Sequence, residues 1–254
     1  MSNLPPAFES RMRKQLGQEA DAFFKALNQP APVSIRLNPI KTTGKIPDTL
    51  QSIVDKKTEW CPEGYFLSQR PVFTLDPCYQ GGAYYVQEAS SMFIGYLLKQ
   101  IIHEQPVKVL DLCAAPGGKS FAAAIAMENC GQVISCDLHP HKKKLIQAGA
   151  DRLGLDIITP QTADGKVFHP EWERAFDLVL VDAPCSGLGV IRKKPDIRYK
   201  DPAPLEGLPE IQLAILSNAA RYVRPGGTLL YSTCTLLRRE NEEVIGTFLT
   251  RDSS

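Results

Sequence analysis

The sequence predicts an α/β fold in which a mostly parallel sheet is covered by helices on both faces. After Pro106, five short apolar runs alternate with stretches whose apolar residues have helical spacing. That alternation is typical of parallel β-α-β units, because each crossover helix returns the chain to the same end of the sheet. Shorter elements precede it. We therefore expect a small α/β N-terminal domain at residues 1–80 and a larger, Rossmann-like domain at residues 81–254.

The composition is that of a globular protein that can bury a large core. The chain has 254 residues, of which 43% are hydrophobic and 22% charged, and its net charge is +1. No apolar run approaches the roughly 18 residues of a membrane span, and the N-terminus lacks the apolar core of an export signal. Both observations predict a cytoplasmic protein without a membrane partner.

The sequence also contains seven cysteines and four short runs of basic residues. An odd number of cysteines in a chain without an export signal predicts free thiols, and the lack of a C-x-x-C pair predicts that no metal is bound. The basic runs lie at 11–14, 142–144, 192–194 and 238–239. Taken singly, each run is more often a solvated face than a phosphate site.

The elements of the first domain follow from apolar spacing and from proline. Residues 5–28 have apolar positions at helical spacing, and Pro30 and Pro32 end that helix. Short strands are expected at 33–38 and 64–68, with a helix at 47–56 between them. A Pro/Gly-rich bridge at 74–82 then leads to a helix at 87–101.

The second domain supplies the parallel sheet. Ligands of such sheets bind beyond the carboxyl ends of the strands, so the chemistry is expected just after Leu112, Cys136, Gln161, Val181 and Ser232. The strands are expected at 107–113, 132–137, 156–164, 175–184 and 226–234, and the helices at 119–127, 141–154, 208–223 and 240–250.

The turn after the first of these strands ends in GGKS, like a phosphate-binding P-loop. That motif needs glycine five positions before Gly118, where this chain has Cys113. Pro116 also removes one N–H from a loop whose donors are backbone N–H groups. The dinucleotide pattern G-x-G-x-x-G fails as well, because the two glycines are adjacent. Nucleotide hydrolysis and dinucleotide binding are therefore both disfavoured.

Two acidic strand ends point instead to an adenosine without a pyrophosphate. Asp137 lies 19 residues after Gly118, the spacing at which an acid meets a ribose hydroxyl pair in Rossmann-like folds. Asp164 follows the third strand, where it can receive the amine of adenine. The small residues of the turn allow close approach of a ligand. The competing interpretation is that both acids are ordinary polar strand ends.

The fourth and fifth strands end in turns that carry thiols. Asp182 and Cys185 share one turn, and Cys234 lies in the other, where the chain leaves the sheet. A thiolate is a strong nucleophile once its pKa is lowered. Two thiols and an acid at the carboxyl ends of neighbouring strands thus indicate covalent catalysis. The alternative is that these residues lie there by coincidence and have no catalytic role.

The segments DLCAAPGGKS (111–120), DAPCSG (182–187) and YSTCT (231–235) resemble the RNA cytosine-5 methyltransferases of the Sun type. VQEASSM (86–92) and RLNP (36–39) are similar to further segments of that family. The resemblance covers roughly residues 33–250 and is strongest with the bacterial RsmF-like (YebU-like) ribosomal enzymes. It implies a methyltransferase that uses S-adenosyl-L-methionine to form 5-methylcytosine in RNA, with 16S ribosomal RNA as the expected substrate and tRNA as the alternative.

The resemblance also implies a role for each reactive residue. Cys234, in the TC segment, would add to carbon 6 of cytosine, so that carbon 5 can take up the methyl group. Asp182 would hydrogen-bond the ring near N3, with Lys119 beside it. Cys185 would release the product by helping to remove the carbon 5 proton. In the DNA cytosine-5 enzymes the Pro-Cys cysteine attacks, and that assignment would exchange the roles of Cys185 and Cys234.

Binding residues follow from the same resemblance. Gln87 and Glu88 would lie against the cofactor pocket, and the target base must leave its stack to reach the thiol. The loop at 189–200 would approach the RNA, with Arg192 and Lys193 as phosphate contacts. The protein is expected to be a monomer. The cofactor would contact Cys113, Ala114, Ala115, Pro116, Gly117, Gly118, Lys119, Asp137, Asp164 and Asp182.

Two further expectations concern the extent of the chain and its class. The family's sheet continues with two more strands, and RsmF-like members add an RNA-binding module, so the sequence is expected to be C-terminally truncated. A non-catalytic RNA-binding or ribosome-assembly factor is the hypothesis from a different class. The presence of both thiols and of Asp182 argues against a non-catalytic factor, since binding alone requires no thiol at the carboxyl end of a strand.

Overall fold

The computed structural model describes residues 4–103, 107–199 and 206–251. Its contacts divide the chain into two compact units. The sheet unit comprises Val33–Ala183 and Ala214–Ser232, and the helical unit comprises Met1–Pro32, Pro184–Leu213 and Thr233–Ser254. The expected domain division between residues 80 and 81 stays a prediction.

The sheet unit begins with a small antiparallel sheet in the order β2-β3-β1-β4. Apolar residues of β1, β3 and β4, among them Ile35, Leu67 and Tyr84, form its core with Leu50 and Phe73. Its strands are β1 (Val33–Leu37), β2 (Val54–Lys57), β3 (Gly64–Leu67) and β4 (Tyr84–Val86), and its short helices are α3 (Asp48–Gln51), η2 (Phe73–Leu75) and α4 (Pro77–Gln80).

One element of this small sheet differs from expectation. The helix expected at 47–56 is a single turn, α3, and Val54–Lys57 form the edge strand β2 instead. These residues pair with β3, so their backbone groups find partners in the sheet rather than in a helix. Lys56 and Lys57 are exposed, as is common on edge strands, where lysine discourages further pairing.

The five-stranded sheet has the expected parallel topology, in the order β7-β6-β5-β8-β9. The interior strand β8 is a nearly continuous buried apolar run, as expected where helices cover both faces of a sheet. The strands are β5 (Val107–Asp111), β6 (Gly131–Asp137), β7 (Ile158–Thr162), β8 (Phe176–Asp182) and β9 (Val223–Ser232).

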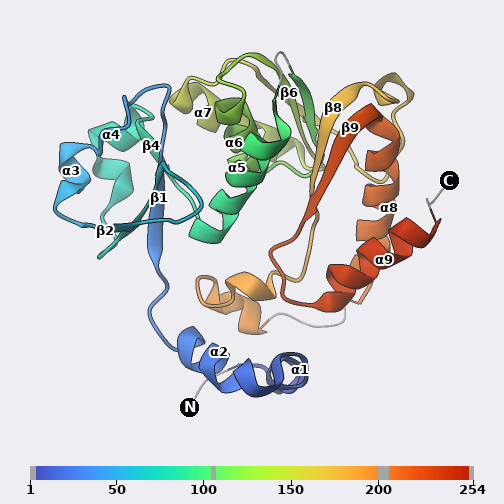
Figure 1. Cartoon of the computed structure of the whole chain (residues 1–254), viewed down its shortest axis with the longest axis horizontal. Coiled ribbons are helices and arrows are strands. Elements are labelled where there is room, and N and C mark those ends of the chain that lie inside the picture. The colour runs from blue at the N-terminus through green and yellow to red at the C-terminus, as the bar shows by residue number, and fades with distance from the viewer. Residues whose placement is uncertain (1–3, 104–106, 200–205, 252–254) are drawn as a thin grey trace. The chain divides into compact units, whose positions relative to one another are not determined.

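The crossover helices cover both faces of this sheet. The chain moves toward one edge through α6 and α7 and toward the other edge through α8, so right-handed crossovers place α8 on the opposite face. Figure 1 shows this arrangement, with α5 beside α6. The expected α/β class with helices on both faces is confirmed. The helices are α5 (Ala89–Ile101), α6 (Gly118–Ala126), α7 (Pro140–Leu153) and α8 (Leu208–Tyr222), with η3 (Pro170–Trp172) before β8.

The main core of the sheet unit lies between the sheet and α5–α7. Leu98 of α5, Phe121 of α6 and Ile146 of α7 are almost fully buried against Val109 and Leu180 of the sheet. Burial of large apolar side chains is the main favourable term in folding, at about 1.5–3 kcal/mol for each side chain. This core therefore fixes the strands whose ends carry the polar residues described below.

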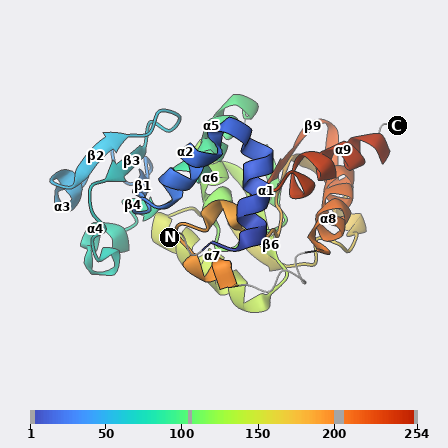
Figure 2. The same cartoon turned by 90° about the horizontal axis from the view of Figure 1, so that it is seen from below.

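The helical unit holds the helices that flank the two thiol-bearing turns. The helix expected at 5–28 is divided by Gly17, whose φ of 55° ends α1 before a short 3₁₀ turn leads into α2. Figure 2 shows α1 and α2 as two helices that meet at an angle. The elements are α1 (Pro6–Leu16), η1 (Gly17–Glu19), α2 (Ala20–Leu27), η4 (Leu188–Val190), η5 (Pro195–Tyr199), η7 (Arg238–Glu240) and α9 (Glu242–Arg251).

A separate apolar cluster holds the helical unit together. Phe8 and Met12 of α1 pack with Phe24 of α2, and this group buries Ile191 and Leu237 from the two turns. The helices of the N-terminal segment are thus built onto the loops that follow Cys185 and Cys234. Among the helices that the structure describes, none has the length and apolarity needed to cross a membrane.

Candidate active site

The carboxyl ends of the parallel strands gather polar residues at one edge of the five-stranded sheet. β5, β6 and β8 each end on an aspartate, Asp111, Asp137 and Asp182, and β9 ends on Ser232. Each end lies within one residue of the position expected from the sequence. Because this edge is where ligands of such sheets bind, these side chains form the frame of the candidate site.

The turn from β5 to α6 is held to the sheet by backbone hydrogen bonds. Ala114 N–H donates to the Cys136 carbonyl at 2.8 Å, and Gly117 N–H donates to the Ala114 carbonyl at 2.7 Å. Gly117 has a φ of 113°, and a Cβ there would come within 2.3 Å of the Phe121 ring. Only glycine fits that position, so the tight path of the turn depends on it.

Beneath the turn lies a buried polar network that the sequence analysis missed. Ser120 Oγ donates to Asp111 Oδ2 at 2.7 Å, and Ser135 Oγ donates to Ser120 Oγ at 2.8 Å. All three side chains are fully buried. Burial raises the pKa of Asp111 to about 6, and the nearby Asp182 carboxylate adds to the effect while Ser120 and Lys119 oppose it. The signal was present as an acid inside an apolar strand, followed nine residues later by Ser120.

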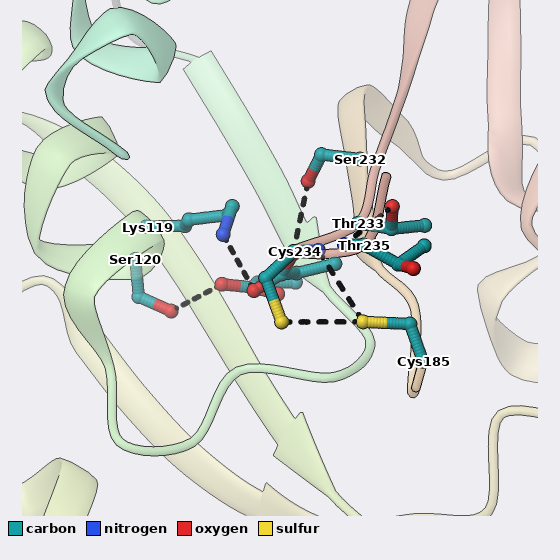
Figure 3. Close-up of polar contacts among 9 residues, drawn as sticks. Lys119, Ser120, Cys185, Ser232, Thr233, Cys234 and Thr235 are labelled. Carbon is teal, nitrogen blue, oxygen red and sulfur yellow. Dashed lines mark hydrogen bonds and ion pairs between the residues drawn. The ribbon is translucent and has the colours of Figure 1, made fainter. Parts of the chain in front are cut away.

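Lys119 and Asp182 form an ion pair at the same edge. Lys119 Nζ lies 2.5 Å from Asp182 Oδ2, and Ser232 Oγ donates to Asp182 Oδ1 at 3.1 Å (Figure 3). Both members of the ion pair are partly buried, so water screens the pair less than it would at an open surface. Both oxygens of Asp182 are therefore held in place, by α6 on one side and β9 on the other.

The two acids expected at the cofactor occupy the neighbouring strand ends. Asp137 is 7% exposed, and its Oδ1 accepts from His139 N–H at 3.1 Å and lies 3.5 Å from Lys142 Nζ. Oδ2 of Asp137 takes part in neither contact. Asp164 is partly buried two residues after β7, and its Oδ1 accepts from Lys166 N–H at 2.9 Å. Both carboxylates are thus oriented by backbone donors that follow them in the chain.

Cys113, in the turn between β5 and α6, and Cys136, in β6, are poor nucleophiles. Burial raises the pKa of Cys113 far above its usual range, and the Asp111 carboxylate adds to the shift. Burial likewise raises the pKa of Cys136 to about 12. Both groups stay protonated near neutral pH, so neither provides a thiolate.

Cys185 and Cys234, both in the helical unit, lie in direct contact. Their sulfur atoms are 3.2 Å apart, and Cys234 N–H donates to Cys185 Sγ at 3.3 Å (Figure 3). Cys234 is exposed, whereas Cys185 is partly buried. The hydrogen bond to Cys234 and burial together raise the pKa of Cys185. The raised pKa keeps the Cys185 thiol protonated near neutral pH, in contact with the Cys234 sulfur.

Side-chain hydrogen bonds tie the two thiol-bearing turns together. Ser186, which follows Cys185, and Thr235, which follows Cys234, share a buried hydrogen bond of 2.7 Å between their hydroxyl oxygens. Gly189 N–H donates to the Cys234 carbonyl at 3.0 Å. These contacts fix the separation of the two sulfur atoms.

A buried carboxylate that the sequence analysis missed completes this support. Glu240 is fully buried, and its Oε2 accepts from Ser186 N–H at 2.8 Å and from Gln212 Nε2 at 3.1 Å. Gln212 Nε2 also donates to the Pro184 carbonyl at 2.9 Å. Nothing in the local sequence marks Glu240, which sits in a charged RREN stretch, because its partners come from distant segments.

The residues expected to contact RNA have different surroundings. Arg192 is partly buried and its Nη1 donates to the Ala26 carbonyl at the end of α2, at 2.8 Å. Lys193 is exposed. Their role as phosphate contacts stays a prediction, and Lys200, at the end of the same expected loop, lies outside the described residues. Within the described ranges, no group of three or more His, Cys, Asp or Glu side chains is arranged to hold a metal ion.

Two family descriptions match the sequence. The family described as 16S rRNA methyltransferase RsmB/F matches residues 97–254, and the N-terminal domain of 16S rRNA methyltransferase RsmF matches residues 4–89. The probable ribosomal RNA small subunit methyltransferase B of Bacillus subtilis is 51% identical over 67% of this chain and 38% of its own length. The ribosomal RNA small subunit methyltransferase F of Erwinia tasmaniensis is 35% identical over 96% of this chain and 53% of its own length. The chain thus spans about half the length, or less, of these relatives.

Solved structures match the fold. The structure of PH0851 has a TM-score of 0.89 at 30% identity, covering 98% of this chain and 57% of that one. A methyltransferase homolog protein from Pyrococcus horikoshii has a TM-score of 0.78 at 27% identity, covering 97% and 78%. NSun6 from Pyrococcus horikoshii, solved with SFG, has a TM-score of 0.80 at 18% identity over 97% and 87%, a likeness of fold alone. The expected methyltransferase fold is confirmed.

Proposed function

The chain belongs to the family of 16S rRNA methyltransferases RsmB/F, and we propose that it forms 5-methylcytosine in small-subunit ribosomal RNA. One observation carries the cytosine-5 chemistry: the Cys185 and Cys234 sulfur atoms lie 3.2 Å apart, on turns cross-linked by buried hydrogen bonds. A single nucleophile needs no second thiol at contact distance. Two thiols fit a reaction in which one adds to the base and the other assists its release.

The methyl donor that fits the sheet unit is S-adenosyl-L-methionine, which supplies an electrophilic methyl group on a sulfonium centre. Asp137 would hold the ribose hydroxyls through Oδ2, and Asp164 the adenine amine. A Cβ at Gly118 would meet nothing closer than Gln87 Nε2 at 3.8 Å, so the backbone there is open to a ligand. The buried Oε1 of Gln87 has no hydrogen-bond partner among the described residues, which supports a ligand donor at this place.

Cys234 acts as the nucleophile in this proposal. Its exposed thiolate adds to carbon 6 of cytosine, which gives carbon 5 the electron density to accept the methyl group. Cys185, whose pKa is raised, hydrogen-bonds the Cys234 sulfur before attack. Bonding of Cys234 to carbon 6 removes its hydrogen bond to Cys185, which is the largest cause of the raised pKa of Cys185. Cys185 can then lose its own proton to water and, as a thiolate, take the carbon 5 proton after methylation, while the Cys234–carbon 6 bond breaks to restore the ring. We assign Cys185 to that second stage, because its sulfur is at contact distance from the attacking sulfur.

The covalent chain supports a role for Asp182 and Lys119 at the same base. Asp182 precedes Cys185 by three residues, and Ser232, its hydrogen-bond partner, precedes Cys234 by two. Because a residue spans at most about 3.6 Å, the backbones that carry the thiols cannot be more than about 11 Å from that of Asp182 or Ser232. Asp182, oriented by Lys119, would accept a hydrogen bond from the cytosine amine beside N3, and the Lys119 cation would offset the negative charge that develops on the ring as Cys234 adds.

The test is a methylation assay with product identification. The 254-residue chain is incubated with S-adenosyl-L-methionine and either 16S rRNA or bulk tRNA, and the RNA is digested to nucleosides for mass spectrometry. We expect 5-methylcytidine in 16S rRNA, none with the Cys234→Ala variant, and unchanged product with Cys130→Ala, which removes an exposed thiol elsewhere. A chain that binds RNA without forming 5-methylcytidine would contradict the proposal in favour of a binding factor, and methylation of tRNA alone would overturn the ribosomal substrate.

A further inference from the structure

A basic pocket of about 360 Å³ lies in the helical unit, between α1 and the segment that follows Cys234. Two basic runs that are far apart in the sequence meet there. Arg11 and Lys14 come from α1, and Arg238 and Arg239 come from η7. The polar residues that line this basic pocket are Arg11, Lys14, Gln15, Arg238, Arg239 and Glu243.

The position of the α1 cations is fixed by packing on the other side of the helix. Phe8 and Met12 are buried in the apolar cluster that includes Leu237, whereas Arg11 and Lys14 lie on an adjoining side of α1 and are exposed. Gln15 Nε2 donates to the Leu236 carbonyl at 2.9 Å. α1 is therefore attached directly to the chain two residues beyond Cys234.

This basic pocket is lined by more cationic than anionic side chains. Four cationic side chains line it against one carboxylate, Glu243. Among the described residues neither Arg11 nor Lys14 has an ion-pair partner. Arg13, on another face of α1, differs in this respect, since it pairs with Glu9 at 3.0 Å and with Asp21 at 2.8 Å. Arg238 has Glu242 at 3.5 Å, an exposed pair that water and salt weaken.

We propose that this basic pocket binds the phosphate backbone of the substrate RNA next to the target cytosine. This rests on the proposed function, because it takes the RNA to be the substrate of Cys234. Arginine forms paired hydrogen bonds to phosphate oxygens, and lysine adds a point charge. The first cation of the pocket after Cys234 is Arg238, four residues further along the chain, so an RNA strand held there is kept close to the nucleophile by the same loop. Phosphate contacts of this kind position a strand without reading its sequence.

The test measures RNA affinity as a function of salt. A fluorescein-labelled single-stranded RNA oligonucleotide of 16S sequence is titrated with the wild-type chain and with the Arg11→Gln/Lys14→Gln variant, and fluorescence anisotropy gives the dissociation constant at each salt concentration. The slope of log affinity against log salt is negative, and each lost phosphate contact reduces its magnitude by about 0.7 for a single strand, so we expect the magnitude to fall by about 1.4. Arg238→Gln alone should reduce the magnitude of the slope by about 0.7.

The matched control removes the same charge from another surface. Lys143 and Lys144 are exposed on α7, and the Lys143→Gln/Lys144→Gln variant should keep the wild-type slope. With the RNA concentration varied at saturating S-adenosyl-L-methionine, Arg11→Gln/Lys14→Gln should raise the KM for RNA at least about tenfold and leave kcat within about twofold, because the pocket positions the RNA and does not touch the reacting atoms. Thermal unfolding of each variant checks that α1 still folds.

The outcomes separate this inference from the proposed function. A wild-type chain that methylates RNA, with an Arg11→Gln/Lys14→Gln variant of unchanged slope and KM, overturns the basic pocket and leaves the methyltransferase proposal standing. Equal loss of slope in the Lys143→Gln/Lys144→Gln control overturns it too, since the effect would then come from overall charge. Conversely, pocket-dependent RNA binding with no 5-methylcytidine would contradict the catalytic proposal while supporting an RNA contact at this place.

Discussion

The sheet unit and the helical unit hold their polar residues by different means. In the sheet unit, Asp137 and Asp182 terminate parallel strands, so the hydrogen-bonded sheet itself sets their spacing. In the helical unit, Cys185 and Cys234 lie outside regular secondary structure, and side-chain hydrogen bonds such as Ser186–Thr235 set theirs.

This difference suits two different tasks. A cofactor site must present one fixed surface in every turnover, and strand ends supply it because a sheet deforms little. In the proposed reaction the thiols exchange partners, from each other to the base and back, within one reaction cycle. Loops anchored by a few hydrogen bonds allow such changes, whereas a strand pairing would oppose them.

The largest effect is expected at Asp182, the residue of the sheet unit that we propose to contact the base. The Asp182→Asn variant loses the ion pair with Lys119, and kcat should fall by roughly 10²–10³-fold, as for the loss of one preorganised electrostatic contact. Single-turnover methylation with saturating RNA measures this. Asp177→Asn is the control, because Asp177 also pairs with a cation, Arg224, but lies at the opposite end of β8. Equal losses in both variants would mean that Asp182 matters only for folding.

The next effect separates cofactor binding from chemistry. The Asp137→Ala variant removes the carboxylate that we expect at the ribose, and the dissociation constant for S-adenosyl-L-methionine should rise by about 10²-fold, the cost of about two hydrogen bonds to a charged group. Isothermal titration calorimetry measures it, with RNA affinity unchanged. Asp164→Asn should raise the same constant only about tenfold. A larger effect at Asp164 than at Asp137 would reverse the assignment of ribose and adenine.

The free energy of unfolding should depend on pH through Asp111, which is buried beneath the turn between β5 and α6. Its folded pKa of about 6 lies above the ordinary 3.8, so the native state binds this proton more tightly than the unfolded chain does. That stabilisation is complete below pH 3.8 and is lost as pH rises through 6. Between pH 4.5 and 7.5 the wild type should lose about 2 kcal/mol relative to Asp111→Asn, which does not titrate. Urea unfolding of both proteins at the two pH values measures it, and a pH-independent difference would place the ionised form in the native state.

The smallest effect concerns the link between the two thiol-bearing turns. Ser186→Ala and Thr235→Val each leave one buried hydroxyl without its partner and should cost about 1–3 kcal/mol, while the double variant should cost less than their sum. Chemical unfolding gives the four free energies of this cycle. Additive losses would show that the 2.7 Å contact does not couple the turns.

Elements and sites that depend on local pattern could be predicted from the sequence. The parallel strands and their polar ends at Asp137 and Asp182 follow from apolar runs and their last residues, which need no knowledge of distant contacts. The break at Gly17 and the edge strand β2 could not, because apolar spacing continues through the former and β2 forms only where β3 offers an edge.

Supporting residues whose partners are distant in the sequence could not be predicted either. Glu240 becomes a supporting group only through Ser186 N–H and Gln212, which are separated from it by 54 and 28 residues. The basic pocket likewise arises from two runs that look ordinary when each is taken alone.

The central claim is that Cys234 attacks the base and Cys185 releases it, and a covalent trap tests this most directly. Cys185→Ala and Cys234→Ala variants are incubated with S-adenosyl-L-methionine and 16S rRNA, denatured, and analysed by gel electrophoresis and intact mass for a protein–RNA adduct. We predict that the adduct accumulates with Cys185→Ala, because release is blocked after attack, and that none forms with Cys234→Ala. Accumulation with Cys234→Ala and none with Cys185→Ala would contradict the account and exchange the roles of the two thiols.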